Sequence, residues 1–162
     1  MAVSKRALRV EPEALPIRAT AGLGFFLREA YRAFARDLDA RLARHGITHA
    51  QWVLLWFLSQ AGSLTPLELA REAGIKKASA TAVIDALKRR GVIRGDPDRA
   101  DRRKINLHLT PAGVALMKDL VACAARTNAD ARGSYSEQEI ETLFRLLRGV
   151  RANLEKAALG SD

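Results

Sequence analysis

The chain has 162 residues, of which 48% are hydrophobic and 28% are charged, a balance that is typical of a globular protein and excludes a disordered chain. The longest unbroken apolar run, Trp52–Leu58, is far shorter than the roughly twenty residues that a membrane helix needs. The chain carries 27 Lys and Arg against 18 Asp and Glu, a net charge of +9, which indicates a polyanionic partner, nucleic acid first and an anionic membrane surface second.

The first part of the chain predicts an arm followed by two helices. Residues 1–18 are expected to form a flexible or loosely docked arm. From Thr20 to about Arg44, apolar residues recur every three or four positions, which predicts a long amphipathic helix. Thr48 and Gln51 have the spacing of a capping box at the start of the next helix. We expect this helix to be buried, because the apolar run 52–58 follows at once.

Two short helices and a glycine-bearing turn come next. Thr65, Pro66 and Glu68 combine a capping box with a proline at the first helical position, where its missing N–H costs nothing. This helix is expected to end at Gly74. A second helix is predicted over 77–90, with one apolar stripe and with basic residues in its last turn, where they suit the helix dipole. The pair is typical of a helix-turn-helix, whose second helix is presented to the DNA major groove.

The apolar period then changes from about four to two, which predicts a β-hairpin. Residues 92–94 and 105–109 are the expected strands, and 95–104 is a long tip rich in turn-forming and basic residues. Between Lys76 and Lys104 there are ten Lys and Arg against four Asp, a net charge of +6. Clustered positive charge favours phosphate binding, although a basic patch that serves only solubility is the alternative.

Two long helices are predicted to complete the chain. Thr110 and Pro111 repeat the cap-and-proline signal, and the helix that they begin is expected to run to about Arg132. Ser136 and Glu139 form a further capping box. The last helix has apolar residues at alternating spacings of three and four, a seam that needs another helix as partner, namely Ile140, Leu143, Leu147, Val150 and Leu154.

In these motifs the sequence resembles the MarR family of bacterial transcriptional regulators, over about residues 23–154. The most specific part is the wing sequence 98–104 followed by Leu-Thr-Pro-x-Gly at 109–113, since a helix-turn-helix alone is a weak signal. The other resembling stretches are 48–54, 69–75, 81–85 and 89–93.

The expected fold is mainly α-helical with a small β-hairpin. It combines a winged helix-turn-helix at 48–110 with a helical dimerisation region at 19–47 and 111–158. The resemblance implies a homodimer that binds double-stranded DNA, with no membrane partner. It also implies that Asp101 and Arg103 work as a unit, in which the acid positions the wing and the arginine enters the minor groove. An ordinary turn aspartate is the alternative for Asp101.

The predicted recognition helix departs from the family pattern. Lys76 replaces the usual serine cap, and Ala78, Ala82 and Ala86 stand where polar or basic residues are common. Few side chains remain that could make bidentate contacts with bases, so we expect the wing and DNA shape to carry an unusual share of the specificity. The candidate DNA-binding residues are Lys76, Lys77, Ser79, Thr81 and Ala82 on the helix, and Arg99, Asp101, Arg102, Arg103 and Lys104 on the wing.

Small aromatic acids bind between the dimer body and the winged domain in MarR relatives, so the resemblance implies such an effector. An arginine, Arg28 or Arg32, would face its carboxylate. Aromatic residues of the first two helices could line the pocket, although most of them are expected to be core. The candidate pocket residues are Phe26, Arg28, Tyr31 and Trp56.

Other chemistry has weaker support. His45 and His49 have the spacing of two metal ligands on one helix face, but Gly46 interrupts them and no further ligands complete a site, so neither a metal nor a cofactor is expected. Cys123 lies in an apolar stretch, which favours an inert core thiol over a redox sensor. A single cysteine also indicates a reducing cytoplasm. No nucleophile–base pair, carboxylate pair or phosphate loop appears, so the chain is not expected to be an enzyme.

Two functional hypotheses remain. The first is a cytoplasmic, ligand-responsive repressor that binds a pseudo-palindromic operator through helix 77–90 and wing 95–104, with half-sites about ten base pairs apart. The second is a low-specificity nucleic-acid-structuring protein without an effector. Competitor DNA distinguishes them, because a regulator should prefer its own upstream region over random duplex by roughly 10³-fold or more.

Overall fold

The computed structural model describes residues 22–98, 101 and 103–160, so the predicted arm 1–18 and the wing candidates Arg99 and Arg102 lie outside the described residues. Within them the chain has six helices and one antiparallel two-stranded hairpin. In chain order the elements are α2 (Gly22–Ala43), α3 (His49–Ala61), α4 (Pro66–Glu72), α5 (Lys77–Arg89), β1 (Ile93–Pro97), β2 (Ile105–Leu109), α6 (Pro111–Arg132) and α7 (Glu137–Leu159).

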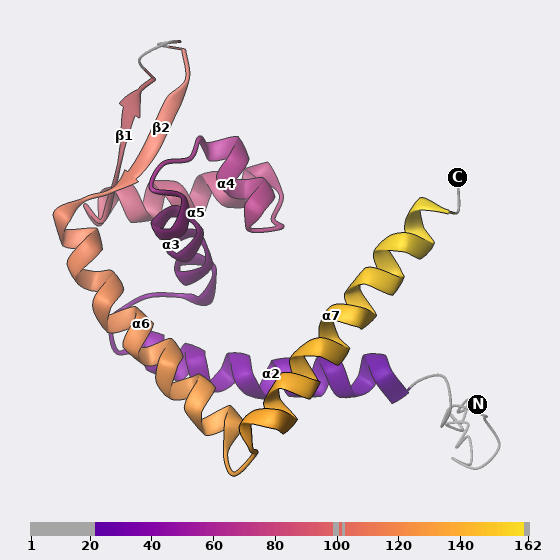
Figure 1. Ribbon diagram of the computed structural model, residues 1–162. Coiled ribbons are helices and arrows are strands. Elements are labelled where there is room, and N and C mark those ends of the chain that lie inside the picture. Colours follow the sequence, from indigo (N-terminus) through magenta and orange to yellow (C-terminus); the bar gives the residue numbers. More distant parts are fainter. Residues whose placement is uncertain (1–21, 99–100, 102, 161–162) are drawn as a thin grey trace, which may run out of the picture.

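The molecule has two parts (Figure 1). The helices α2, α6 and α7 form an open frame, which we call the body. The helices α3, α4 and α5 and the hairpin form a compact group on one side of the body, which we call the lobe, and the hairpin projects from the end of the lobe that is remote from α2. The six helices and the two-stranded hairpin confirm the mainly α-helical fold class that the sequence predicts.

The predicted helix starts are confirmed, because capping is a local interaction. In each of three capping boxes the cap hydroxyl accepts a backbone N–H of the first turn, and the Glu or Gln three residues later accepts the N–H of the cap residue; the pairs are Thr48 with Gln51, Thr65 with Glu68, and Ser136 with Glu139. The α5 helix differs, since no side chain of the described residues caps it and Lys76 occupies the cap position. Such a cap is typically worth about 1 kcal/mol.

Several element boundaries differ from the sequence prediction by one or more residues. The first helix ends at Ala43 rather than about Arg44, and Gly46, at φ 62°, closes the turn after it. The predicted strand 92–94 was too short, since β1 runs to Pro97, which pairs with Ile105. The turn-forming residues from Gly95 onward had favoured a loop. Both strands of a two-stranded hairpin are edge strands, however, so a proline at the strand end removes no hydrogen bond that the hairpin needs. The tip is therefore confined to 98–104.

The core of the lobe is built around α3, as its apolar sequence predicts. Leu54, Leu55 and Leu58 are fully buried. The hairpin joins this core through Leu107, which is also fully buried and exchanges two backbone hydrogen bonds with Leu64, with N···O distances of 2.8 and 3.3 Å. The base of the wing is thus part of the core, while its tip projects into solvent.

The motif Leu-Thr-Pro-x-Gly joins the lobe to the body, and its glycine has a steric cause. The Thr110 hydroxyl donates to the Gly91 carbonyl at 2.6 Å, and the Thr110 N–H donates to the Val92 carbonyl at 3.0 Å. The first turn of α6 is pressed so closely on this segment that a Cβ added to Gly113 would lie 2.0 Å from the Val92 carbonyl oxygen. No side chain fits in that space.

A polar network ties α2 to α6 within the body. Arg41 donates from Nε to Asp37 at 2.7 Å and also pairs with Asp130 on α6. The buried hydroxyl of Thr127 donates to the same Asp37 carboxylate at 2.7 Å. Hydrogen bonds from Arg41 first and Thr127 second hold the pKa of Asp37 below its ordinary value. Because no buried side-chain nitrogen or oxygen of the described residues lacks a hydrogen-bond partner, the network is compatible with its partly buried place.

The predicted apolar seam of α7 is mostly uncovered. Ile140 is buried, but Leu143, Leu147 and Leu154 are exposed. Figure 1 shows α7 crossing α2 and leaving the rest of the body. None of the helices that the structure describes has the length and apolar character to cross a membrane.

We expect Gly113→Ala to lower the free energy of unfolding by about 2–3 kcal/mol, the usual cost of forcing a methyl group into filled space. Chemical denaturation followed by circular dichroism measures it. Gly149→Ala is the matched control, because nothing lies within 4 Å of a Cβ at Gly149 and helical periodicity directs it away from the seam. An unfolding free energy for Gly113→Ala equal to that of the control would contradict this account.

Candidate nucleic-acid interface

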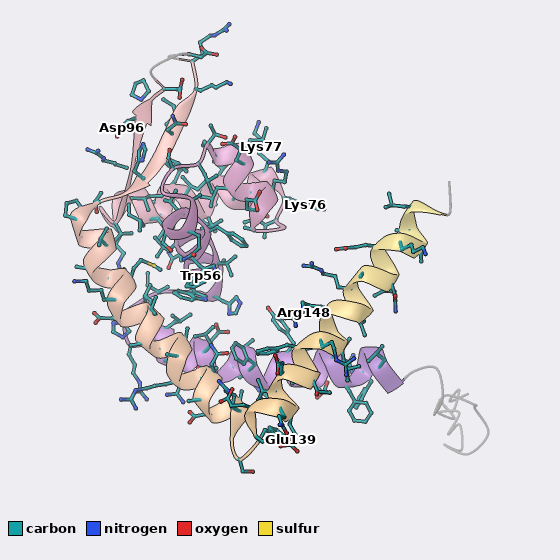
Figure 2. All side chains as sticks on the ribbon, viewed as in Figure 1. Trp56, Lys76, Lys77, Asp96, Glu139 and Arg148 are labelled. Atoms are coloured by element: carbon teal, nitrogen blue, oxygen red, sulfur yellow. The ribbon has the colours of Figure 1, made fainter. Side chains whose placement is uncertain are left out.

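The α5 helix presents one side to the core of the lobe and the other to solvent. Ala80, Ile84 and Leu87 are buried at spacings of four and three, so the opposite face is free along the whole helix. Figure 2 shows Lys77 at the top of the lobe and Lys76 at its right-hand edge. The predicted helix candidates are all exposed, namely Lys76, Lys77, Ser79, Thr81 and Ala82.

The exposed face of α5 offers few donors to a base edge. The Thr81 hydroxyl donates to the Lys77 carbonyl one turn earlier at 3.0 Å, which leaves its lone pairs and its methyl group facing outward. Helical spacing aligns Ala78, Ala82 and Asp85 on the outermost line. No described residue pairs with the Asp85 carboxylate. The sequence reasoning gave Asp85 no role, although an acid within a basic segment is itself a signal, since a carboxylate can accept from the cytosine amino group.

The predicted Asp101–Arg103 unit forms at the wing tip. The Asp101 Oδ1 accepts from the Arg103 backbone N–H at 3.1 Å and from Arg103 Nε at 3.0 Å. The Asp101 side chain is 31% exposed, whereas that of Arg103 is 91% exposed. The acid therefore lies against the loop and orients a guanidinium that faces solvent. Both hydrogen bonds, the side-chain one first, hold the pKa of Asp101 below its ordinary value.

A second acid organises the same tip. The Asp98 carboxylate accepts from the Asp101 N–H at 2.9 Å and from Asn106 Nδ2 at 2.7 Å. The Asp98 N–H donates to the Lys104 carbonyl at 2.9 Å, and the Lys104 N–H donates to the Asp101 carbonyl at 2.8 Å. The sequence reasoning assigned Asp98 no role of its own. Here it closes the loop on which Arg103 and Lys104 are carried.

Not every cation of the basic segment is equally available. Arg94 Nε lies 3.2 Å from Asp96 Oδ2, and His108 Nε2 lies 3.9 Å from the same oxygen across the hairpin. Asp96 on β1 (Figure 2) thus offsets part of the positive charge at the wing base. The tip and the exposed face of α5 remain as the two basic elements, and the hairpin that carries the tip projects at the end of the lobe remote from α2 (Figure 1).

The four predicted pocket residues are not brought together. Phe26 and Tyr31 line an apolar groove of about 970 Å³ between α2, α6 and α7. Arg28 instead lies with its guanidinium 5.5 Å from the Phe25 ring and pairs with Glu29. Trp56 packs on Trp52 within α3, with ring centroids 5.5 Å apart.

The groove itself suits an apolar occupant better than an acid. Its described lining is mostly aliphatic and aromatic, and the charged residues in that lining are Asp37 and Asp130. A carboxylate placed there would be repelled by both. The groove also contains Leu143 and Leu147 of the α7 seam, so the seam and the groove are one continuous apolar surface.

His49 and Cys123, considered above as a metal ligand and a redox sensor, contact other side chains of the fold. His49 Nδ1 lies 2.9 Å from Asp39 Oδ1, and the Tyr31 ring meets the His49 ring edge-on at 6.4 Å between centroids. Cys123 is half-buried beside the core. Among the described residues, no three His, Cys, Asp or Glu side chains are grouped closely enough to hold a metal ion.

The sequence matches a family model and is similar to a characterised regulator. The family model described as the MarR family matches residues 47–105. The chain is 29% identical to the HTH-type transcriptional repressor NicR of Pseudomonas putida over 142 residues, 88% of this chain and 90% of that protein.

Two solved structures are similar as well. Bordetella bronchiseptica BpsR, solved in work on the regulation of its DNA binding by 6-hydroxynicotinic acid, is 30% identical with a TM-score of 0.71, over 79% of this chain and 97% of that one. A mutant MarR from E. coli complexed with operator DNA is 23% identical and shares the fold, with a TM-score of 0.76 over 85% of this chain and 99% of that one.

The lowered pKa of Asp101 predicts how the wing responds to acid. A carboxyl whose folded pKa is depressed stabilises its contacts above the unfolded pKa of about 3.9 and loses them as pH falls through the lower folded value. In an ¹⁵N NMR titration from about pH 6 to about pH 2, the Arg103 Nε–H signal should move with a midpoint below that of a free aspartate. Asp101→Asn should abolish the movement, and its persistence in that variant would refute the pairing.

Proposed function

The chain belongs to the MarR family, and from this premise we propose that it is a ligand-responsive repressor that binds a pseudo-palindromic operator as a cytoplasmic homodimer. As a family member it is a DNA-binding transcriptional regulator and not an enzyme, and its relative NicR is a repressor. The observation that carries the proposal is the pairing of an exposed α5 face with a projecting basic wing at one end of the lobe.

The two elements match the two grooves of a duplex. The α5 helix enters the major groove, where Ser79, Thr81 and Ala82 meet base edges, and Ala82 suits a thymine methyl group. Lys76 and Lys77 are free to contact phosphates. The Arg103 guanidinium, held outward by Asp101, fits the narrow, strongly negative minor groove of A·T-rich DNA.

A second copy of the chain is the proposed occupant of the apolar groove. Large apolar surface exposed on α2 and α7 marks a protein–protein interface, and a two-fold axis lets the same surface cover itself. In this arrangement residues 19–47 and 111–158 form the dimerisation region, and each chain presents a DNA-binding region at 48–110. The two lobes then meet half-sites about ten base pairs apart.

A small aromatic acid is the proposed effector. Support comes from BpsR, whose DNA binding is regulated by 6-hydroxynicotinic acid. Of the pocket candidates, Tyr31 has the most suitable position, because it lies on α2 of the body and its ring meets that of His49 at the start of α3 in the lobe. An effector that favours a lobe spacing mismatched to the operator would release DNA by shifting the population of conformations.

A footprint on the DNA flanking the gene tests the proposal. We expect a protected pseudo-palindrome that the protein prefers over random duplex by roughly 10³-fold or more, and a protection that aromatic acids weaken. Equal affinity for the flanking DNA and for random duplex would contradict it, and would instead support a low-specificity nucleic-acid-structuring protein without an effector.

Leu147→Glu tests the dimer. Because Leu147 lines the groove, a carboxylate there would be buried without a partner, and we expect the dimer dissociation constant to rise at least about 100-fold. Sedimentation equilibrium measures this constant. Leu159→Glu is the matched control, since Leu159 ends the same helix on another face and lies 84% exposed. An undisturbed dimer in Leu147→Glu would contradict the proposed interface.

A further inference from the structure

The body and the lobe are joined by two chain crossings. The first is the turn 44–48 between α2 and α3, and the second is Thr110 between β2 and α6. The first crossing is hydrogen-bonded to Arg90 and the second to Gly91 and Val92, and these three consecutive residues immediately follow the recognition helix α5. The end of α5 is therefore the place where both connections between the two parts meet.

Arg90 holds the first crossing. Its Nη1 donates to the Gly46 carbonyl at 2.6 Å, and its Nη2 donates to the His45 carbonyl at 2.5 Å. These partners are 44 and 45 residues away in the sequence. Both hydrogen bonds are charge-assisted, and the planar guanidinium fork meets two neighbouring oxygens at once, which a lysine ammonium cannot match in geometry.

The turn after α2 is shaped to present those two carbonyls. The Gly46 N–H donates to the Ala43 carbonyl at 2.9 Å, and the Ile47 N–H donates to the Leu42 carbonyl at 3.2 Å. Gly46 itself has φ 62°, and a Cβ there would lie only 3.2 Å from Arg90 Nη1. A cation at a helix C-terminus is also favoured by the helix dipole, so the position suits an arginine for two independent reasons.

The next two residues hold the second crossing. The Gly91 carbonyl accepts from the Thr110 hydroxyl at 2.6 Å, and the Val92 carbonyl accepts from the Thr110 N–H at 3.0 Å. A tilt of α5 relative to α2 would strain the bonds of Arg90, because the contacts with Thr110 constrain the same short segment from the other side.

We propose that Arg90 is a positioning residue that fixes the direction of the recognition helix relative to the body, and that operator preference depends on it without contact between Arg90 and DNA. The inference rests on the proposed function, because only a repressor that matches two half-sites needs its lobes held at a set angle. Random duplex makes no such demand, so its affinity should change little.

The test compares the full-length variants Arg90→Met, Arg90→Lys and Arg89→Met. Arg89 is the matched control for amide exchange, because it is adjacent in the chain, carries the same charge and is exposed. In the free protein, amide exchange at Gly46, Ile47 and Val92 followed by NMR should accelerate about 10-fold in both Arg90 variants and stay at the wild-type rate in Arg89→Met. Unchanged exchange in both Arg90 variants would overturn the proposal, whether or not an operator exists.

The second measurement uses DNA. Anisotropy titrations over a salt series should show operator preference over random duplex falling about 10-fold in both Arg90 variants, with the wild-type salt dependence. Wild-type operator preference in Arg90→Lys would overturn the positioning role. So would a salt slope in Arg90→Met that is lower by the ~0.9 expected for one lost phosphate contact. A wild-type protein with no operator preference contradicts the proposed function instead, and the exchange measurement still decides the role of Arg90.

Discussion

The apolar surface that a single chain leaves uncovered is the constraint on which the rest of the molecule depends. The lobe buries its own core around α3, but the body does not: side chains of α2 and α7, among them Phe26 and Leu154, stay exposed. Exposed apolar surface of this extent is costly in water and is relieved by association. The two carboxylates that line the groove are already paired with Arg41, so they do not oppose an apolar partner. In our proposal a second copy covers this surface and thereby sets the distance between two lobes.

A set distance is useful only if each lobe is held rigidly. The structure provides this where α5 ends, since Thr110 binds the segment from α6 and Arg90 binds the turn after α2. The tight packing of Gly113 on the Val92 carbonyl allows little movement there. At the far end of the lobe the wing repeats the principle on a smaller scale, because Asp98 and Asp101 hold the loop so that Arg103 faces outward.

The sequence predicted those features that depend on neighbours in the chain. Capping boxes were located to the residue, because a cap and its partner are three positions apart, and the basic segment that our proposal places against DNA was visible from charge alone. Contacts between residues far apart in the chain were not predicted. The bonds of Arg90 span more than forty residues, and the arrangement of pocket candidates depends on which helix faces which. Phe26 faces the groove between α2, α6 and α7, and the periodicity within α2 does not show which helices lie opposite it. The ion pair between Arg94 and Asp96 was not predicted either, because it requires β1 to continue past the turn-forming residue Gly95.

The stoichiometry of the complex with duplex DNA tests the central claim most directly. Sedimentation velocity of the protein mixed with a duplex that contains the footprinted site gives the mass of the complex at low ionic strength. The account predicts two chains on each duplex, bound together and without a stable one-chain complex, because each chain needs the other to cover its body and to match the second half-site. One chain per duplex, or no complex at all, would contradict it.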